Sequence, residues 1–427
     1  MANRPLMAAG KNLSNRPRRL LLCLDGVPFD QICRARERGL FDKFNGPSRL
    51  LSPFPTMTNI ALAAMLGGST PLGYETIYFD REAREVRGGV GKYLGRRTAD
   101  KVPSTYMDQL DYQEPLPFEF LVYIAPETVW RADMRRFHDR FRHAPQDRDY
   151  FAFLKGTDGL LHIRGAERLD VALQSLDEIL NEIQMWCGSE TEIVLFSDHG
   201  MSVQPHRRVH LQTHLRDAGF VLTRSLVESS GREVVMPAFG LIGFAALNCA
   251  PGIESALADS LTSVEGIDLA LYRESDSAVN VKSARGFARI HQRAKADELF
   301  YRYESVDGDP LNLSSTLKEM LGEGLLTDDG FASATIWTER TQASIYPDVL
   351  NNLYTSLQTS RVCNPADVLV SLLDGYYIGW SAFEYIVKLA ATHGNAMRAS
   401  STAFLMSTHR DFGEFVTASN AKDVLRK

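Results

Sequence analysis

Cysteine is scarce in this sequence, and no two cysteines form a CxxC pair. The chain has 427 residues, of which five are cysteines, an odd number. Several of them lie inside apolar runs, so we expect small buried side chains and not disulfides or thiolate ligands of zinc. They are Cys23, Cys33, Cys187, Cys249 and Cys363.

Long hydrophobic runs are missing as well. The longest apolar stretch, residues 237–250 (PAFGLIGFAALNCA), is shorter than the roughly 20 residues that a membrane span needs. Residues 1–18 form a polar N-terminal tail without the apolar core of a secretory signal. We therefore expect a cytoplasmic protein that does not associate with membranes.

Positive charge is not in excess either. Lysine and arginine total 47 against 53 aspartates and glutamates, which gives a formal net charge of −6. Binding to nucleic-acid polymers or to membrane surfaces requires a basic field, so the composition argues against both. An anionic small molecule would have to be held by local charge, such as a metal ion or a few arginines.

Short apolar runs recur along the chain and predict buried strands. Runs of this kind suit central parallel strands that are covered on both faces. Apolar residues spaced by three and four over residues 169–186 predict an amphipathic helix between two such strands. We therefore predict an α/β fold, a three-layer α/β/α sandwich with a mostly parallel central sheet. The strands are predicted at residues 19–24, 118–124, 150–154, 192–196 and 367–373.

The chain is too long for one compact core, so we expect two domains or one large domain with an insertion. Residues 275–365 mix polar helices with strands and carry their own turn signals, such as Asp307-Gly308-Asp309-Pro310. We predict that they form an inserted α+β cap. Residues 19–274 and 366–427 would then form the core of the fold.

Several predicted strands are followed by carboxylates and imidazoles. Ligands in open α/β sheets bind beyond the carboxyl ends of the strands, and mixed oxygen and nitrogen donors suit zinc or manganese. Each residue taken alone has a structural explanation, such as a polar turn, a helix cap or a satisfied histidine. Taken together they predict a two-metal site for phosphate transfer. The candidate ligands are Asp25, Asp158, His162, Asp198, His199 and His393.

Thr58 would complete such a site as a nucleophile. It stands just before the small-residue helical stretch at residues 60–66, where free N–H groups attract anions. A bound cation can lower the pKa of a hydroxyl and so activate it. Two alternatives remain: Thr58 caps the helix, or the neighbouring Thr56 is the nucleophile.

Two other patterns give weaker signals. Gly88-Gly89-Val90-Gly91-Lys92 resembles half a phosphate loop but lacks the Ser or Thr after the lysine. His206, His210 and His214 have a four-residue spacing that could line one helix face, and we interpret them as a solvated or structural row.

The ordered motifs resemble those of the alkaline phosphatase superfamily over nearly the whole chain. The nearest branch is the type I phosphodiesterases and nucleotide pyrophosphatases, with the phosphonoacetate hydrolase group included. The resemblance implies one zinc held by Asp158, His162 and His393. It implies a second zinc held by Asp25, Asp198 and His199, with Thr58 counted among the metal ligands and acting as the nucleophile. The motifs are LLLCLDGVPFD, PFPTMTNIALAAMLGGSTP, KGTDGLLHIRG, LFSDHGM and THGN.

Two departures from the family leave the substrate open. Asn59-Ile60 stands where the family usually has an aromatic residue and a proline, and residues 74–80 lack the asparagine that helps hold a phosphoryl oxygen. No substrate-binding residue is identified.

The resulting hypothesis is a two-zinc hydrolase of phosphodiester or phosphate-ester bonds that works through a covalent phospho-threonine. Its substrate would be a small phosphorylated or phosphonate molecule, and manganese or iron could replace zinc. The alternatives are a phosphonate (C–P) hydrolase or phosphomutase of the same superfamily, and a non-catalytic binding relative.

Overall fold

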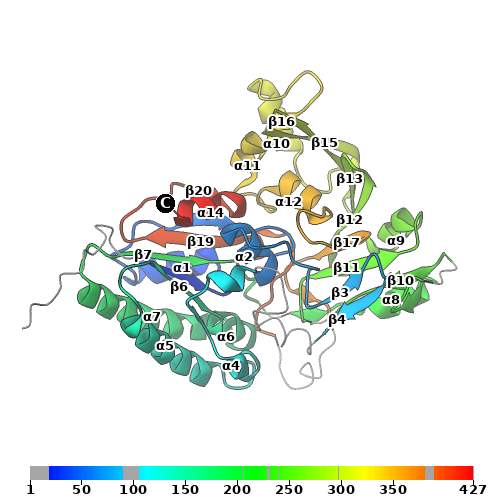
Figure 1. Cartoon of the computed structure of the whole chain (residues 1–427). Helices are drawn as coiled ribbons and strands as arrows, with labels where there is room; N and C mark the ends of the chain where they lie inside the picture. The colour runs from blue at the N-terminus through cyan, green and yellow to red at the C-terminus, as the bar shows by residue number, and fades with distance from the viewer. Residues whose placement is uncertain are drawn as a thin grey trace, which may run out of the picture.

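A seven-stranded sheet forms the centre of the computed structural model (Figure 1). The structure describes residues 19–89, 105–204, 206–227, 231–238, 240–296, 298–379 and 389–426. In this sheet only β19 runs antiparallel to its neighbours, so the prediction of a mostly parallel sheet is confirmed. The strand order is β20 (Phe415–Thr417), β2 (Ser48–Leu51), β19 (Thr402–Ser407), β7 (Glu192–Ser197), β1 (Arg19–Leu24), β6 (Tyr150–Leu154) and β5 (Tyr112–Gln113).

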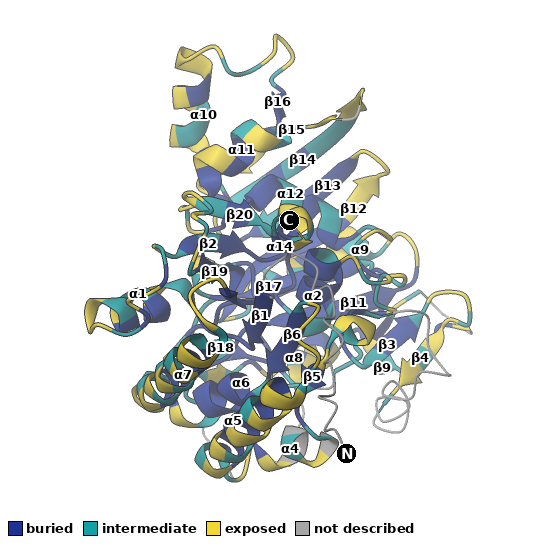
Figure 2. Ribbon diagram, turned by 60° about the vertical axis from the view of Figure 1, so that its left-hand side comes forward, coloured by how far each residue is buried: buried dark blue, intermediate teal, exposed yellow. Residues whose placement is uncertain are grey.

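Helices cover both faces of this sheet. Successive residues of a strand point to opposite sides, so alternate residues are buried against the helices on each face. Leu20 and Leu22 of β1 pack with one group of helices, whereas Leu21 and Cys23 pack with the other. The first group is α1 (Phe29–Glu37), α5 (Pro126–His143), α6 (Gly156–Arg164) and α7 (Ala166–Cys187). The second is α2 (Thr58–Leu66) and α14 (Ala418–Arg426). Figure 2 shows the buried strands between helices whose outer faces are exposed. The three-layer prediction is confirmed.

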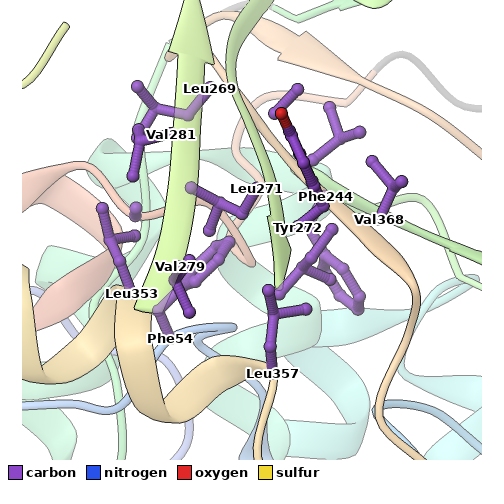
Figure 3. Packing of buried hydrophobic residues seen from close by; sticks show 14 of the residues in the cluster. Phe54, Phe244, Leu269, Leu271, Tyr272, Val279, Val281, Leu353, Leu357 and Val368 are labelled. Atoms are coloured by element: carbon purple, nitrogen blue, oxygen red, sulfur yellow. The ribbon is translucent and has the colours of Figure 1, made fainter. Parts of the chain in front are cut away.

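A second, mostly antiparallel sheet of nine strands has its own apolar core (Figure 3). Phe54, which precedes Thr58 in the chain, is buried in this core near Val279 and Leu353. The segment between β2 and α2 is therefore anchored on the second sheet. The strand order is β16 (Ala332–Ser333), β15 (Glu298–Gly308), β14 (Gly286–Lys295), β13 (Ala278–Ser283), β12 (Ile267–Ser275), β17 (Val368–Leu372), β11 (Phe244–Cys249), β10 (Glu233–Val235) and β9 (Val221–Thr223).

The helices beside the second sheet are α9 (Glu254–Leu261), α10 (Ser314–Gly322), α11 (Ala334–Thr341) and α12 (Val349–Ser356). Two small sheets pair β3 (Ile77–Asp80) with β4 (Glu85–Gly88) and β8 (Arg207–Arg208) with β18 (Tyr376–Tyr377). The predicted cap runs from residue 275 to residue 365, and the nine-stranded sheet contains strands from inside and from outside these limits. The division into core and cap stays a prediction.

The strand predicted at residues 118–124 is wrong. The structure has a short helix there, α4 (Leu116–Leu121), in which a proline stands in the first turn. Proline fixes a φ suited to the start of a helix, and a short apolar run does not by its periodicity distinguish strand from helix. Tyr123 follows this helix, in the turn before α5.

The three spaced histidines, His206, His210 and His214, do not share one helix face. Helix α8 (Leu211–Asp217) begins after His210, so His206 and His210 lie outside it and only His214 is helical. Residues 1–18 and 90–92, which contain the predicted tail and part of the glycine-rich motif, lie outside the described residues. No helix in the described part of the chain has both the length and the apolar character that crossing a bilayer requires.

Candidate metal centre

The six candidate ligands meet beyond the ends of the central strands. They form two groups of three, and within each group one ligand atom per residue lies within 4.8 Å of the others. We call Asp25, Asp198 and His199 the strand-end group, since they follow β1 and β7 directly. We call Asp158, His162 and His393 the helix–loop group, since the first two are on α6 and the third is on the loop before α13 (Arg398–Ser401).

The register of two parallel strands builds the strand-end group. Leu24 of β1 pairs with Ser197 of β7, so the two aspartates that follow them emerge side by side. The Nε2 atom of His199 lies 3.5 Å from Oδ1 of Asp25 and 3.4 Å from Oδ2 of Asp198. All three ligand side chains are buried.

One helix turn and one distant loop build the helix–loop group. Oδ1 of Asp158 lies 3.2 Å from Nε2 of His162, four residues further along α6, and 3.6 Å from Nε2 of His393. The His393 loop is held in place by a bridge between Thr392 and Ser202, which follows the strand-end group in the chain. The rings of His199 and His393 stack at 4.1 Å between centroids, so the two groups are adjacent.

Backbone carbonyls set the tautomer of all three histidines. The Nδ1 atom of His162 lies 2.8 Å from the carbonyl oxygen of Ala391. The Nδ1 atom of His199 lies 2.9 Å from the carbonyl oxygen of Gly200, and that of His393 lies 2.7 Å from the carbonyl oxygen of Thr56. A carbonyl oxygen accepts a hydrogen bond and cannot donate one, so Nδ1 carries the hydrogen. In a neutral ring Nε2 then keeps its lone pair, which is the arrangement of a metal-binding histidine with an ordered outer partner.

Burial strongly perturbs the carboxylates. It raises the pKa of Asp198 to about 7, and burial together with the charge of Asp198 raises that of Asp25. Burial also raises the pKa of Asp158, but the His162 imidazole beside it outweighs this effect and the net pKa lies below the usual range. Three carboxylates gathered away from water need positive charge nearby.

The donor set fits divalent cations. Among the residues that the structure describes, Oδ1 of Asp158 and Oδ2 of Asp198 are buried and have no hydrogen-bond partner, and both face imidazole nitrogens of their own group. Burial lowers the pKa of His199 and His393, which favours the neutral rings that metals bind, whereas at His162 burial is outweighed by the Asp158 carboxylate, which raises the pKa. Each group thus offers carboxylate oxygen and imidazole nitrogen, the mixture that zinc accepts.

The two threonines are placed differently. Oγ1 of Thr58, the first residue of α2, lies 3.2 Å from Oδ1 of Asp25 and 3.3 Å from Nε2 of His199. Oγ1 of Thr56 is fully buried and accepts the N–H of Gly394 at 2.8 Å. Of the two hydroxyls, that of Thr58 is in contact with the candidate ligands.

Sequence reasoning missed the residues that support the ligands. Gly26 donates its N–H to Oδ1 of Asp198 at 3.1 Å, and the hydroxyl of Tyr123 lies 3.5 Å from Oδ2 of Asp158. Gly26 has a positive φ of 72°, which the Asp25-Gly26 pair after a strand could have indicated. Tyr123 gave no signal, because its contact depends on the packing of α4 and α6.

Comparison with known proteins establishes the fold. The structure is similar to that of phosphonoacetate hydrolase from Sinorhizobium meliloti 1021 in complex with phosphonoformate, with 13% sequence identity, 95% of this chain and 94% of that chain covered, and a TM-score of 0.50. The murine ectonucleotide pyrophosphatase/phosphodiesterase 5 gives 14% identity, 96% and 94% coverage, and a TM-score of 0.45. No protein-family model and no curated protein sequence matches the chain. The likeness to the phosphonoacetate hydrolase structure shows the fold alone, which is the kind of fold that the resemblance in the motifs implied.

Proposed function

We propose that this protein is a hydrolase of phosphodiester or phosphate-ester bonds that uses Thr58 as its nucleophile and two divalent cations, zinc by preference. The observation that carries the proposal is the contact of the Thr58 hydroxyl with Asp25 and His199, next to two adjacent groups of three potential ligands. A half-buried threonine with a purely structural role would not require such a concentration of carboxylates and imidazoles around it.

The residues of the chain position the reacting atoms. The strand-end group holds the Thr58 oxygen, and the first turn of α2 presents backbone N–H groups where phosphoryl oxygens would lie. Bound to the two groups, divalent cations would supply Lewis acidity, which lowers the pKa of the hydroxyl and offsets the charge of the phosphoryl oxygens.

The reaction proceeds in two displacements. Oγ1 of Thr58 gives up its proton and forms a bond to phosphorus while the bond from phosphorus to the leaving-group oxygen breaks. This gives a phospho-threonine, and the leaving group departs as an alcohol after taking up a proton from solvent. Water then attacks phosphorus, the bond to Oγ1 breaks, and the free hydroxyl is restored. Thr56 does not suit this role because backbone groups of the His393 loop occupy its hydroxyl.

The test uses zinc-loaded protein and three probes: bis(p-nitrophenyl) phosphate as a diester, p-nitrophenyl phosphate as a monoester, and phosphonoacetate. We expect release of nitrophenol from the esters and a loss of roughly 10³-fold or more in kcat for Thr58→Ala. Zinc content should stay near that of the wild type, Thr58→Ser should restore part of the rate, and mass spectrometry should place the phosphoryl group on Thr58.

Thr56→Ala serves as the matched control. It should lower the rate far less, because it only loosens the loop that carries His393. Full activity in Thr58→Ala would remove Thr58 from the mechanism. Turnover of phosphonoacetate alone would instead favour a phosphonate hydrolase, and less than one equivalent of bound metal with no turnover would favour a binding protein.

A further inference from the structure

Tyr123 stands at the edge of the candidate metal centre and is 36% exposed. Its hydroxyl lies 3.5 Å from Oδ2 of Asp158, and its ring centroid lies 6.4 Å from that of His162. One tyrosine therefore lies beside two of the three members of the helix–loop group while it stays partly exposed.

Close packing against α6 puts Tyr123 in this position. A Cβ atom on Gly159 would lie 2.4 Å from Cγ2 of Val122, so only a residue without a side chain leaves room for the segment that precedes Tyr123. Gly156, three residues earlier on the same helix, makes similar room for Trp130 of α5. The glycines of α6 thus let the chain around Tyr123 pack close to this helix, which places Tyr123 beside Asp158.

The two buried aspartates Asp158 and Asp198 share one arrangement. In Asp198, Oδ1 accepts the N–H of Gly26, while Oδ2 faces His199 and has no hydrogen-bond partner in the described part of the chain. In Asp158, Oδ2 accepts a hydrogen bond from Tyr123, while Oδ1 faces two imidazoles and likewise has no partner among the described residues. In each aspartate a hydrogen-bond donor holds one carboxylate oxygen, and the other oxygen, which faces imidazole, is left for a cation. The donor is backbone in one group and a partly exposed side chain in the other.

We propose that Tyr123 is a positioning residue of the helix–loop group, whose hydroxyl holds Asp158 in the orientation that binds a cation. This inference rests on the proposed function, since it assumes that the helix–loop group binds metal. Outer partners of metal ligands restrict rotation of the ligand, and their loss typically lowers metal affinity about 10- to 100-fold. Tyr123 would then set the affinity of one metal site without contacting the metal.

The test measures zinc affinity in Tyr123→Phe, which removes the hydroxyl and keeps the ring. Competition with a chromophoric chelator resolves the two zinc dissociation constants. We expect one of them to rise about 10- to 100-fold and the other to stay at the wild-type value. Hydrolysis of bis(p-nitrophenyl) phosphate should fall at limiting zinc and recover when zinc saturates the weakened site.

Two further variants locate the effect. Tyr303→Phe removes a tyrosine–aspartate hydrogen bond of 2.7 Å to Asp309 in the second sheet, and it should leave both zinc affinities unchanged. His393→Ala removes a ligand from the helix–loop group, and adding Tyr123→Phe to it should not alter the affinity of the remaining site. Thermal unfolding of each variant shows whether it is folded.

Wild-type affinities at both sites of a folded Tyr123→Phe protein would overturn the inference. If the wild type binds two zinc ions and hydrolyses the diester, that result leaves the proposed function standing and rejects only the role of Tyr123. If the wild type binds no zinc, the proposed function fails and this inference fails with it.

Discussion

The strand-end group and the helix–loop group use the same kinds of ligand, but the fold builds them differently. The strand-end group comes from the ends of two paired strands, and its outer contact on Asp198 is the N–H of Gly26. The helix–loop group needs one turn of α6, a loop from near the C-terminus and a contact from Tyr123. The first depends on main-chain geometry, and the second depends on several segments that pack together.

Charge also separates the two groups. The strand-end group contains two carboxylates and one imidazole, whereas the helix–loop group contains one carboxylate and two imidazoles. We expect the strand-end group to bind a divalent cation more tightly than the helix–loop group, because it has more negative charge and is supported by main-chain geometry. The comparison thus leads to the expectation that the two groups differ in metal affinity through both their charge and the segments that support them.

The largest expected effect is the loss of a carboxylate. Asp198→Asn and Asp158→Asn should each lower diester hydrolysis by roughly 10³-fold or more, because both cations are used. After dialysis, Asp158→Asn should keep the tightly held ion of the strand-end group, whereas Asp198→Asn should keep little metal. Metal analysis by mass spectrometry checks this, and the reverse order of retention would contradict the comparison.

The next effect concerns stability and pH. A carboxyl group with a raised pKa binds its proton more tightly in the folded state, so Asp198 makes the zinc-free protein less stable as pH rises from about 4 through about 7. The pKa of Asp25 is also raised, so Asp25 acts in the same direction. Bound zinc removes this loss of stability. When free zinc is in a hundredfold excess over its dissociation constant, binding adds about 2.7 kcal/mol to the free energy of unfolding. The rise in unfolding temperature on adding zinc should be larger near pH 8 than near pH 5.5. An equal rise at both values would show that these carboxylates do not bind the metal.

The smallest expected effect comes from removing the buried hydroxyl that supports the chain beside each group. Ser197 accepts the N–H of Val27 at 2.8 Å beside His199, and Thr56 accepts the N–H of Gly394 at 2.8 Å beside His393. Ser197→Ala and Thr56→Ala each leave a buried N–H unsatisfied, so each should cost about 1–3 kcal/mol of unfolding free energy. Ser197→Ala should weaken only strand-end metal binding, and Thr56→Ala only helix–loop binding. Denaturant unfolding and chelator competition measure both, and weakening of both sites by either variant would argue against independent support.

Local sequence predicted three inner strands of the central sheet, β7, β1 and β6, but not β2 and β19. The apolar runs at residues 19–24 and 150–154 coincide with β1 and β6, because strands buried on both faces need an apolar residue at every position. The run at residues 118–124 looked the same and became α4 and a turn. A short apolar run has too few residues to reveal its period, so its neighbours in space decided its form.

The sequence by itself placed Asp25 and the Asp198-His199 pair at strand ends and Asp158 four residues before His162 after another strand, because these relations are local along the chain. Only the tertiary structure brought His393 beside His199, separated the Thr58 hydroxyl from that of Thr56, and set Tyr123 on Asp158. Those contacts join segments far apart in the chain. Their distances depend on how strands align and helices pack, which no local pattern encodes.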